Sequence, residues 1–209
     1  AVNPRKQGTK VAAHYTVTVG AGQTQVIRLR LSSTSPGQEG EPFGKQFDAV
    51  FADRLREADE FYKSVTPPSV SADAANVMRQ AIAGMLWSKQ FYFFGVETWM
   101  DGDDPNAPPP PERSRIRNAH WRHLNSMRIL SMPDKWEYPW FAAWDLAFQA
   151  LTLSLVDFEF AKDQISLMLF EQFQHPNGQI PAYEWEFSDL NPPVHAWATW
   201  RIFHLERVK

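Results

Sequence analysis

Apolar and polar residues alternate with a period of two near the start of the chain. His14–Val19 is rich in β-branched and aromatic residues, Gly20–Gly22 is typical of a turn, and Gln25–Leu31 alternates apolar with polar side chains. This is the period of a half-buried strand, so residues 11–31 predict a β-hairpin. Because a lone hairpin is marginally stable in water, we expect it to pair with other strands or to pack on helices.

From residue 47 onward, apolar residues recur three and four positions apart, which is the spacing of amphipathic helices. The predicted helices cover Phe47–Tyr62, a stretch that follows the capping residues Ser71 and Asp73, about Trp140–Val156, about Phe158–Phe173, and a stretch that begins after Pro192 and Pro193. Serine and aspartate cap helix N-termini, and proline suits the first turn. The pattern therefore predicts a mainly α chain that follows a short β segment.

Two segments interrupt these patterns. Residues 32–42 are rich in Ser, Pro, Gly and Glu, and 101–111 combines acidic residues with the consecutive prolines Pro108–Pro111. The first predicts a linker and the second an exposed, extended loop. We therefore divide the chain into a β-strand part (1–35), a linker with a connecting helix (36–70) and a helical part (71–209). The arginines between 113 and 128 are expected to pair with nearby acids.

Composition narrows the class of protein. The chain has 209 residues, 44% of them hydrophobic and 22% charged, with a net charge of -3. This charge argues against a general nucleic-acid binder, which is normally basic. No apolar stretch approaches the roughly 20 residues of a transmembrane helix, so no membrane partner is expected. The absence of cysteine excludes disulfides and thiolate metal sites, and it leaves the compartment open, with the cytoplasm favoured.

Aromatic residues and carboxylates gather in two places between the predicted helices. The chain contains 9 tryptophans, most of which we expect in the core. The first group contains Tyr138, Trp140, Trp144 and Asp145, and the second contains Gln179, Tyr183, Glu184 and Trp185. Aromatic rings stack on the C–H faces of sugars, while carboxylates and amides hydrogen-bond to hydroxyls in fixed directions. These eight residues are the predicted substrate-binding set.

Three carboxylates in these groups carry specific expectations. Asp145 lies in the first turns of a predicted helix, where the helix dipole favours an anion. Glu184 and Glu186 are two residues apart, so on an extended backbone they would point to the same side. A helix-start carboxylate without a further role, and a pair of surface acids, remain open alternatives.

Other chemistry has weaker support. His120 and His123 are three residues apart, and a metal hydrolase could combine them with Glu137 and Asp145. Without a glutamate motif beside the histidines, ordinary hydrogen-bonded histidines fit the spacing better. Ser131 and Ser188 lack a nucleophile elbow. We expect no metal site and no cofactor.

Three runs of the sequence resemble bacterial members of glycoside hydrolase family 63, which includes processing α-glucosidases and mannosylglycerate and glucosylglycerate hydrolases. The runs are Met132–Phe148, His175–Trp185 and Asn191–Ala198, and their order and spacing also match. The resemblance covers roughly residues 71–209. It implies that this part contains the first helices of an (α/α)6 toroid of the six-hairpin glycosidase type, and that the preceding hairpin belongs to a β-sandwich-like domain.

The same resemblance implies roles for particular residues. Trp144 and Asp145 would bind the sugar in the cleavage subsite, and Gln179, Tyr138 and Trp140 would line the pocket. In the family, the general acid and the general base lie in later motifs that this sequence lacks. No residue of the chain is therefore assigned as catalytic, and whether the chain is an enzyme stays open.

These observations lead to two main expectations. In the first, the chain is the carbohydrate-binding portion of an inverting α-glycosidase that hydrolyses glucosyl or mannosyl linkages, incomplete and inactive alone. In the second, it is a complete, non-catalytic carbohydrate-binding or scaffold protein. The expected partners are an oligosaccharide or small glycoside and, because helices of a partial toroid would expose apolar stripes, a second copy or a further segment of the same enzyme.

Overall fold

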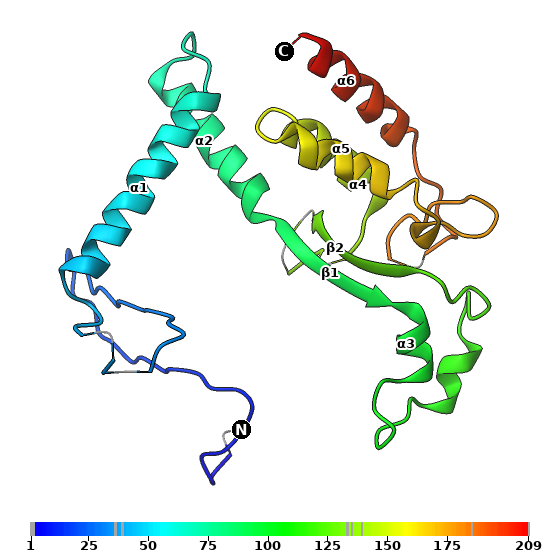
Figure 1. Cartoon of the computed structure of the whole chain (residues 1–209), viewed down its shortest axis with the longest axis horizontal. Helices are drawn as coiled ribbons and strands as arrows, with labels where there is room; N and C mark the ends of the chain where they lie inside the picture. Colours follow the sequence, from blue (N-terminus) through cyan, green and yellow to red (C-terminus); the bar gives the residue numbers. More distant parts are fainter. Residues whose placement is uncertain are drawn as a thin grey trace. The chain divides into compact units, whose positions relative to one another are not determined.

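The computed structural model describes residues 3–35, 37–38, 40–132, 134, 136–138, 140–184 and 186–208 (Figure 1). The chain forms two compact units, Ala1–Asp59 and Glu60–Lys209. Its described part is helix-rich and contains a two-stranded antiparallel sheet. The prediction of a mainly helical chain with one β-hairpin is confirmed at this level, although the hairpin lies elsewhere in the sequence.

In the first unit, the described residues before α1 (Lys45–Val65) form neither helix nor strand. The predicted turn is present, since the amide of Gln23 donates to the carbonyl of Gly20 at 3.1 Å. The predicted hairpin at residues 11–31 is wrong, because the segments on either side of this turn do not pair. Every residue from 11 to 31 is exposed, so the alternating apolar side chains bury no surface that would stabilise a ladder.

In the second unit, the predicted helices are confirmed, and the two that were predicted at 140–156 and 158–173 are shorter than expected. The confirmed helices are α2 (Ala72–Trp87), α4 (Ala143–Leu153), α5 (Phe158–Leu167) and α6 (Val194–Val208). The hydroxyl of Ser71 accepts from the amide of Ala74 at 3.2 Å, which is the predicted cap. Short elements connect them: α3 (Val96–Asp101) and two 3-10 turns, η1 (Pro111–Arg115) and η2 (Glu171–Phe173).

The sheet of the second unit pairs β1 (Lys89–Gly95) with β2 (Asn125–Ser131). In this register Phe91 lies opposite Ile129, and Phe93 lies opposite Met127. These four side chains share one face, and each is more than half exposed. On the other face, Leu130 is buried and Tyr92 is half-buried. The sheet therefore has one face packed on the core and one apolar face that the described residues leave open.

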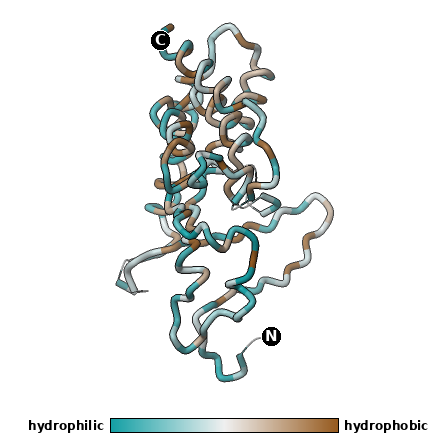
Figure 2. The backbone as a smooth tube through the Cα atoms, turned by 90° about the vertical axis from the view of Figure 1, so that its right-hand side faces the viewer, coloured by the Kyte–Doolittle hydropathy of each residue, from teal (hydrophilic) through white to brown (hydrophobic). Residues whose placement is uncertain are grey.

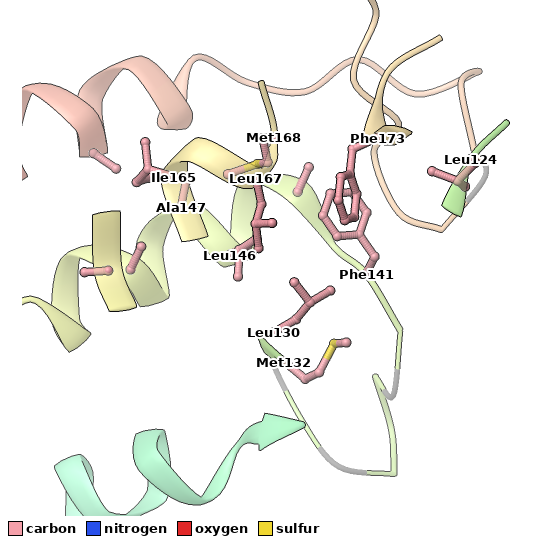
Figure 3. Packing of buried hydrophobic residues seen from close by; sticks show 14 of the residues in the cluster. Leu124, Leu130, Met132, Phe141, Leu146, Ala147, Ile165, Leu167, Met168 and Phe173 are labelled. Carbon is pink, nitrogen blue, oxygen red and sulfur yellow. The ribbon is translucent and has the colours of Figure 1, made fainter. Parts of the chain in front are cut away.

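The core lies where α4, α5 and α6 pack on one another and on β2. Alanines at the contacts, including Ala147, Ala150, Ala161 and Ala198, allow the helices to approach closely. Figure 3 shows Leu146 and Met168 within this core, and beyond them the rings of Phe141 and Phe173, whose centroids are 5.6 Å apart. Hydrophobic and hydrophilic positions alternate along the helices (Figure 2), as the amphipathic pattern requires.

Candidate functional site

A short β-bridge brings together the two aromatic and carboxylate groups of the sequence. Ala142, which precedes α4, pairs antiparallel with Tyr183 in the segment between η2 and α6 (Figure 1). The amide of Ala143 donates to Ala182 at 2.9 Å, and the amide of Glu184 donates to Phe141 at 2.7 Å. Main-chain hydrogen bonds therefore hold residues about 40 positions apart in sequence against each other.

A pocket of about 290 Å³ lies beside this bridge. Its polar lining includes Gln179, Asn191 and His195, and its apolar lining includes Trp144, together with Ala143, Met168, Ile180, Leu190 and Pro192. Trp144 is 40% exposed, so part of the indole remains available to a ligand. An aromatic wall with a few polar groups is a common composition for a small-molecule site.

Main-chain contacts orient the polar groups of the pocket. The side-chain amide of Gln179 donates to the carbonyl of Phe187 at 2.9 Å, and that of Asn191 donates to Ile180 at 2.9 Å. The Nε2 atom of His195 lies 2.9 Å from the carbonyl oxygen of Ile165. Each side chain thus has one end fixed by the fold.

Asp145 lies in the first turn of α4, as predicted. Desolvation by burial raises the pKa of its carboxyl, because a charged group loses hydration there. The outcome is a carboxyl that takes up a proton more readily than an ordinary aspartate.

Glu184 has an unusual backbone. Its φ is +40°, a conformation that residues with a side chain seldom adopt. Desolvation raises the pKa of its carboxyl, while a hydrogen bond from Tyr92 acts in the opposite direction. The hydroxyl of Tyr92 lies 3.5 Å from the carboxylate, and its own pKa is raised by burial and by the charge of Glu184. Strain held in place by the fold often marks a functional segment.

Glu186 behaves differently from Glu184. Its side chain is buried and forms an ion pair with Arg117. It also accepts hydrogen bonds from the amide and the hydroxyl of Ser188, and these contacts lower the pKa of its carboxyl. The expectation that Glu184 and Glu186 point to the same side is wrong, because the backbone of Glu184 is not extended and only Glu186 has a buried side chain. The expected pairing of the arginines with acids is confirmed for Arg117 and for Arg122, which binds Asp101.

The histidines 120 and 123 lie in an aromatic cluster. The ring of His120 is 5.8 Å from that of His175, and the indole of Trp121 donates to Nε2 of His123 at 2.7 Å. Within the described ranges, no three His, Asp or Glu side chains gather closely enough to hold a metal ion.

Seven of the eight predicted substrate-binding residues lie among the described residues, and the fold does not gather them at a single site. Trp144 and Gln179 line the pocket. Tyr183 and Glu184 lie at the bridge, and Asp145 follows Trp144 in α4. Tyr138 and Trp140 contact each other, with ring centroids 5.2 Å apart, outside the described lining of the pocket. Trp185 lies outside the described residues.

Three residues of this region were missed by the sequence analysis: Tyr92, Asn191 and His195. The aromatic run at 91–94 is a strand signal that could have drawn attention to Tyr92. Asn191 and His195 flank the two prolines before α6, but only the fold shows that both face the pocket of Trp144.

The chain is similar to a protein of Saccharomyces cerevisiae described as "Uncharacterized protein YMR196W". The two are 46% identical over 215 positions, which cover 99% of this chain and 20% of the yeast protein. The chain therefore spans about a fifth of the length of this relative. No family model matches the chain, and no solved structure matches it. Among the described residues, no helix is both long and apolar enough to cross a bilayer.

Proposed function

We propose that this chain is the carbohydrate-binding portion of an inverting α-glycosidase that acts on glucosyl or mannosyl linkages. The observation that carries the proposal is the pocket of Trp144, Gln179, Asn191 and His195. Its volume of about 290 Å³ is near the lower end of small-molecule pockets, which span about 300–1,000 Å³. A single monosaccharide unit fits such a space better than a long oligosaccharide.

The composition of the pocket supports a neutral polar ligand. The partly exposed indole of Trp144 offers a surface for the C–H face of a sugar ring. Gln179 and Asn191 offer amide groups with fixed orientation, which suits directional contacts with hydroxyls. The described lining contains neither Asp nor Glu and neither Lys nor Arg. A charged ligand would therefore find no counter-ion in the lining.

The same composition supports binding rather than hydrolysis by this chain. An inverting glycosidase needs a carboxylic acid and a carboxylate about 6.5–9.5 Å apart on either side of the bond, and the described lining contains no carboxyl group. Asp145 directly follows the lining residue Trp144, and the amide of Glu184 donates to Phe141, two residues before the lining residue Ala143. The raised pKa of both carboxyl groups is compatible with hydrogen bonding to a ligand. In this proposal, the acid and the base come from elsewhere in the enzyme.

For the fold, we propose that α2, α4, α5 and α6 are early helices of an (α/α)6 toroid. The support is that α4 and α5 pack together and are joined by only four residues, 154–157, since such helix pairs are the repeating unit of an α/α architecture.

The second candidate is a non-catalytic carbohydrate-binding or scaffold protein. The open apolar face of the β1–β2 sheet favours a scaffold role, because large exposed apolar patches mark interaction surfaces.

The proposal is tested by titrating the chain with methyl α-D-glucopyranoside and methyl α-D-mannopyranoside and following amide chemical shifts by NMR. We expect saturable shifts around the pocket and a loss of affinity of about five- to 150-fold in Trp144→Ala, taking the roughly 1–3 kcal/mol of a ring stacked on an aromatic side chain as the guide. Trp87→Ala removes an exposed indole outside the described lining and is the matched control. Equal affinities of the two variants would contradict the proposal.

Hydrolysis is measured separately, with p-nitrophenyl α-glucoside and α-mannoside. We expect no release of p-nitrophenol above the buffer rate. Turnover that disappears in Asp145→Asn would contradict the view that this chain only binds sugar.

A further inference from the structure

The proline-rich loop that follows α3 takes no part in the pocket. The chain is neither helix nor strand from Gly102 to Pro110, and every residue between these bounds is exposed except Gly102 and Pro109. The predicted exposed, extended loop is therefore confirmed, and Figure 1 shows it projecting from the end of α3. None of its residues lines the pocket of Trp144, so the proposed function does not account for it.

Four consecutive prolines fix the backbone of this loop. Proline holds its own φ at about −65° and moves the residue before it to an extended ψ, and each of the residues 107–110 precedes a proline. Pro110 has φ −61° and ψ 142°, the values of a polyproline II helix. Pro111 is the first residue of η1, but its ring continues the polyproline II path, because ψ of Pro110 and the locked φ of Pro111 place it.

This segment, 107–111, is anchored at two points. The ring of Pro109 packs on the backbone of Gly102, where an added Cβ would lie 2.7 Å from Cδ of the proline. The amide of Arg113 donates to the carbonyl of Pro110 at 3.0 Å. A segment that is already held in its extended form loses little conformational entropy when a partner binds it.

The exposed rings lie on the ridges that this anchor leaves open. A polyproline II helix has about three residues per turn, so Pro108 and Pro111 share one ridge, and Ala107 and Pro110 share a second. All four residues are exposed. The third ridge carries Pro109, which rests on its own chain. The fold thus covers one ridge and presents two, and a polyproline II ligand needs two ridges to fill a groove.

A cation lies at the carboxyl end of the segment. Arg113 comes two residues after Pro111. Its guanidinium donates to the carbonyl of Trp99 at 2.6 Å, and its Cζ atom lies 4.6 Å from the centre of the Trp99 ring. Among the described residues, no carboxylate forms an ion pair with Arg113, whereas Arg117 and Arg122 each pair with one. The charge of Arg113 is thus left for an acidic group of a partner.

We propose that residues 107–113 dock in the groove of a partner protein module of the SH3 kind, which is lined by aromatic rings and bordered by acidic residues. The two proline ridges fill the aromatic groove, and Arg113 faces its acidic border. Pro108, Pro111 and Arg113 have the spacing proline-x-x-proline-x-arginine that this arrangement requires. The inference is independent of the proposed function, because it uses no residue of the pocket.

The probes are the purified SH3 domains of Saccharomyces cerevisiae, the organism of the similar protein, with the purified WW domains of the same organism beside them. Binding of the full chain to each domain is measured by isothermal titration calorimetry. We expect saturable binding to at least one SH3 domain, weakened about tenfold or more in Pro108→Ala and in Pro111→Ala, because each change removes a ring from the groove. Pro105→Ala removes an exposed proline of the same loop outside the segment and is the matched control.

A second measurement isolates the cation. Binding of the wild type should weaken as salt rises, and Arg113→Gln should both weaken binding and lose part of this salt dependence. Arg115→Gln removes an exposed charge two residues further along the chain and should change the affinity less. Circular dichroism checks that each variant is folded. If Arg113→Gln does not fold, the salt dependence of the wild type and the two proline variants still test the inference.

Three results would overturn the inference. The first is an absence of saturable binding to every SH3 domain. The second is equal affinity of the wild type, Pro108→Ala and Pro111→Ala. The third is binding to WW domains alone, since the acidic border would then not select the partner. Binding of sugars to the pocket has no bearing on any of them.

Discussion

Two glutamates two positions apart in the sequence have opposite environments. Glu184 lies in a strained turn, and desolvation of its carboxyl raises its pKa. Glu186 is 2% exposed, and its hydrogen bonds with Ser188 and its ion pair with Arg117 lower its pKa. A carboxylate with a lowered pKa stabilises the folded state most when it is charged. The contribution of Glu186 to the stability of the fold therefore depends on pH.

We expect Glu186→Gln to lower the free energy of unfolding by about 1–2 kcal/mol at pH 7, in the range of hydrogen bonds to charged groups. The folded pKa of Glu186 is below its unfolded value of about 4.3. The contribution of the charge is thus fully present above pH 4.3 and is lost as the pH falls through the folded pKa. Urea denaturation from pH 7 downward should show the difference between the two proteins shrinking once the pH falls through the folded pKa of Glu186. Glu137→Gln, at an exposed position, is the control, and a difference that does not depend on pH would contradict the expectation.

At the scale of elements, one side chain on α5 completes the sheet. The side-chain oxygen of Gln164 accepts from the amide of Ser131 at 3.0 Å, and its nitrogen donates to the carbonyl of Ile129 at 3.1 Å. Gln164 thus presents a donor and an acceptor to β2 as the peptide group of a neighbouring strand would. These two hydrogen bonds join β2 to α5, which packs on α4 and α6.

We expect Gln164→Leu to lower the free energy of unfolding by about 2–4 kcal/mol, because two main-chain groups lose their partners next to a side chain that is 1% exposed. Chemical denaturation measures this loss, and hydrogen exchange should show faster exchange at Ser131. Gln80→Leu, at an exposed position of α2, should change stability by less than about 0.5 kcal/mol. Equal losses of unfolding free energy in the two variants would show that the hydrogen bonds of Gln164 do not stabilise the sheet.

At the scale of the molecule, the open face of the sheet is an apolar surface that the described core does not cover. Phe91, Phe93, Met127 and Ile129 form two adjacent cross-strand pairs, all more than half exposed. A contiguous apolar face of this kind favours association. The apolar pattern of the sequence predicts such a surface on helices, whereas the structure has it on β1 and β2, which that pattern does not predict.

We therefore expect the chain to associate as its concentration rises, and Ile129→Lys to reduce that association by at least tenfold. Sedimentation velocity across a concentration series measures the effect. Val77→Lys changes a similarly exposed but isolated residue on α2 and should leave association unchanged. A monomer at every concentration in the wild type would contradict this expectation.

The sequence by itself determined the longer helices among the described residues, α1, α2, α4, α5 and α6, because each has a local signal, whereas the short α3 was not predicted. Ser71 caps α2, Pro192 and Pro193 precede α6, and apolar residues recur at helical spacing in between. Helical hydrogen bonds join residues four apart, so local sequence carries most of the information. The sequence also located Trp144 and Gln179, whose residue types suit a ligand pocket.

Only the tertiary structure decided which segments pair and which side chains share a site. Strand pairing joins distant residues, so the alternation at 11–31 did not produce a sheet, while Lys89–Gly95 and Asn125–Ser131 did because they pack on buried helices. The contrast between Glu184 and Glu186 depends on one positive φ and on Arg117, about 70 residues away in the sequence. The side-chain oxygen of Asn191 is buried without a partner among the described residues, and burial is likewise a property of the folded chain and not of local sequence.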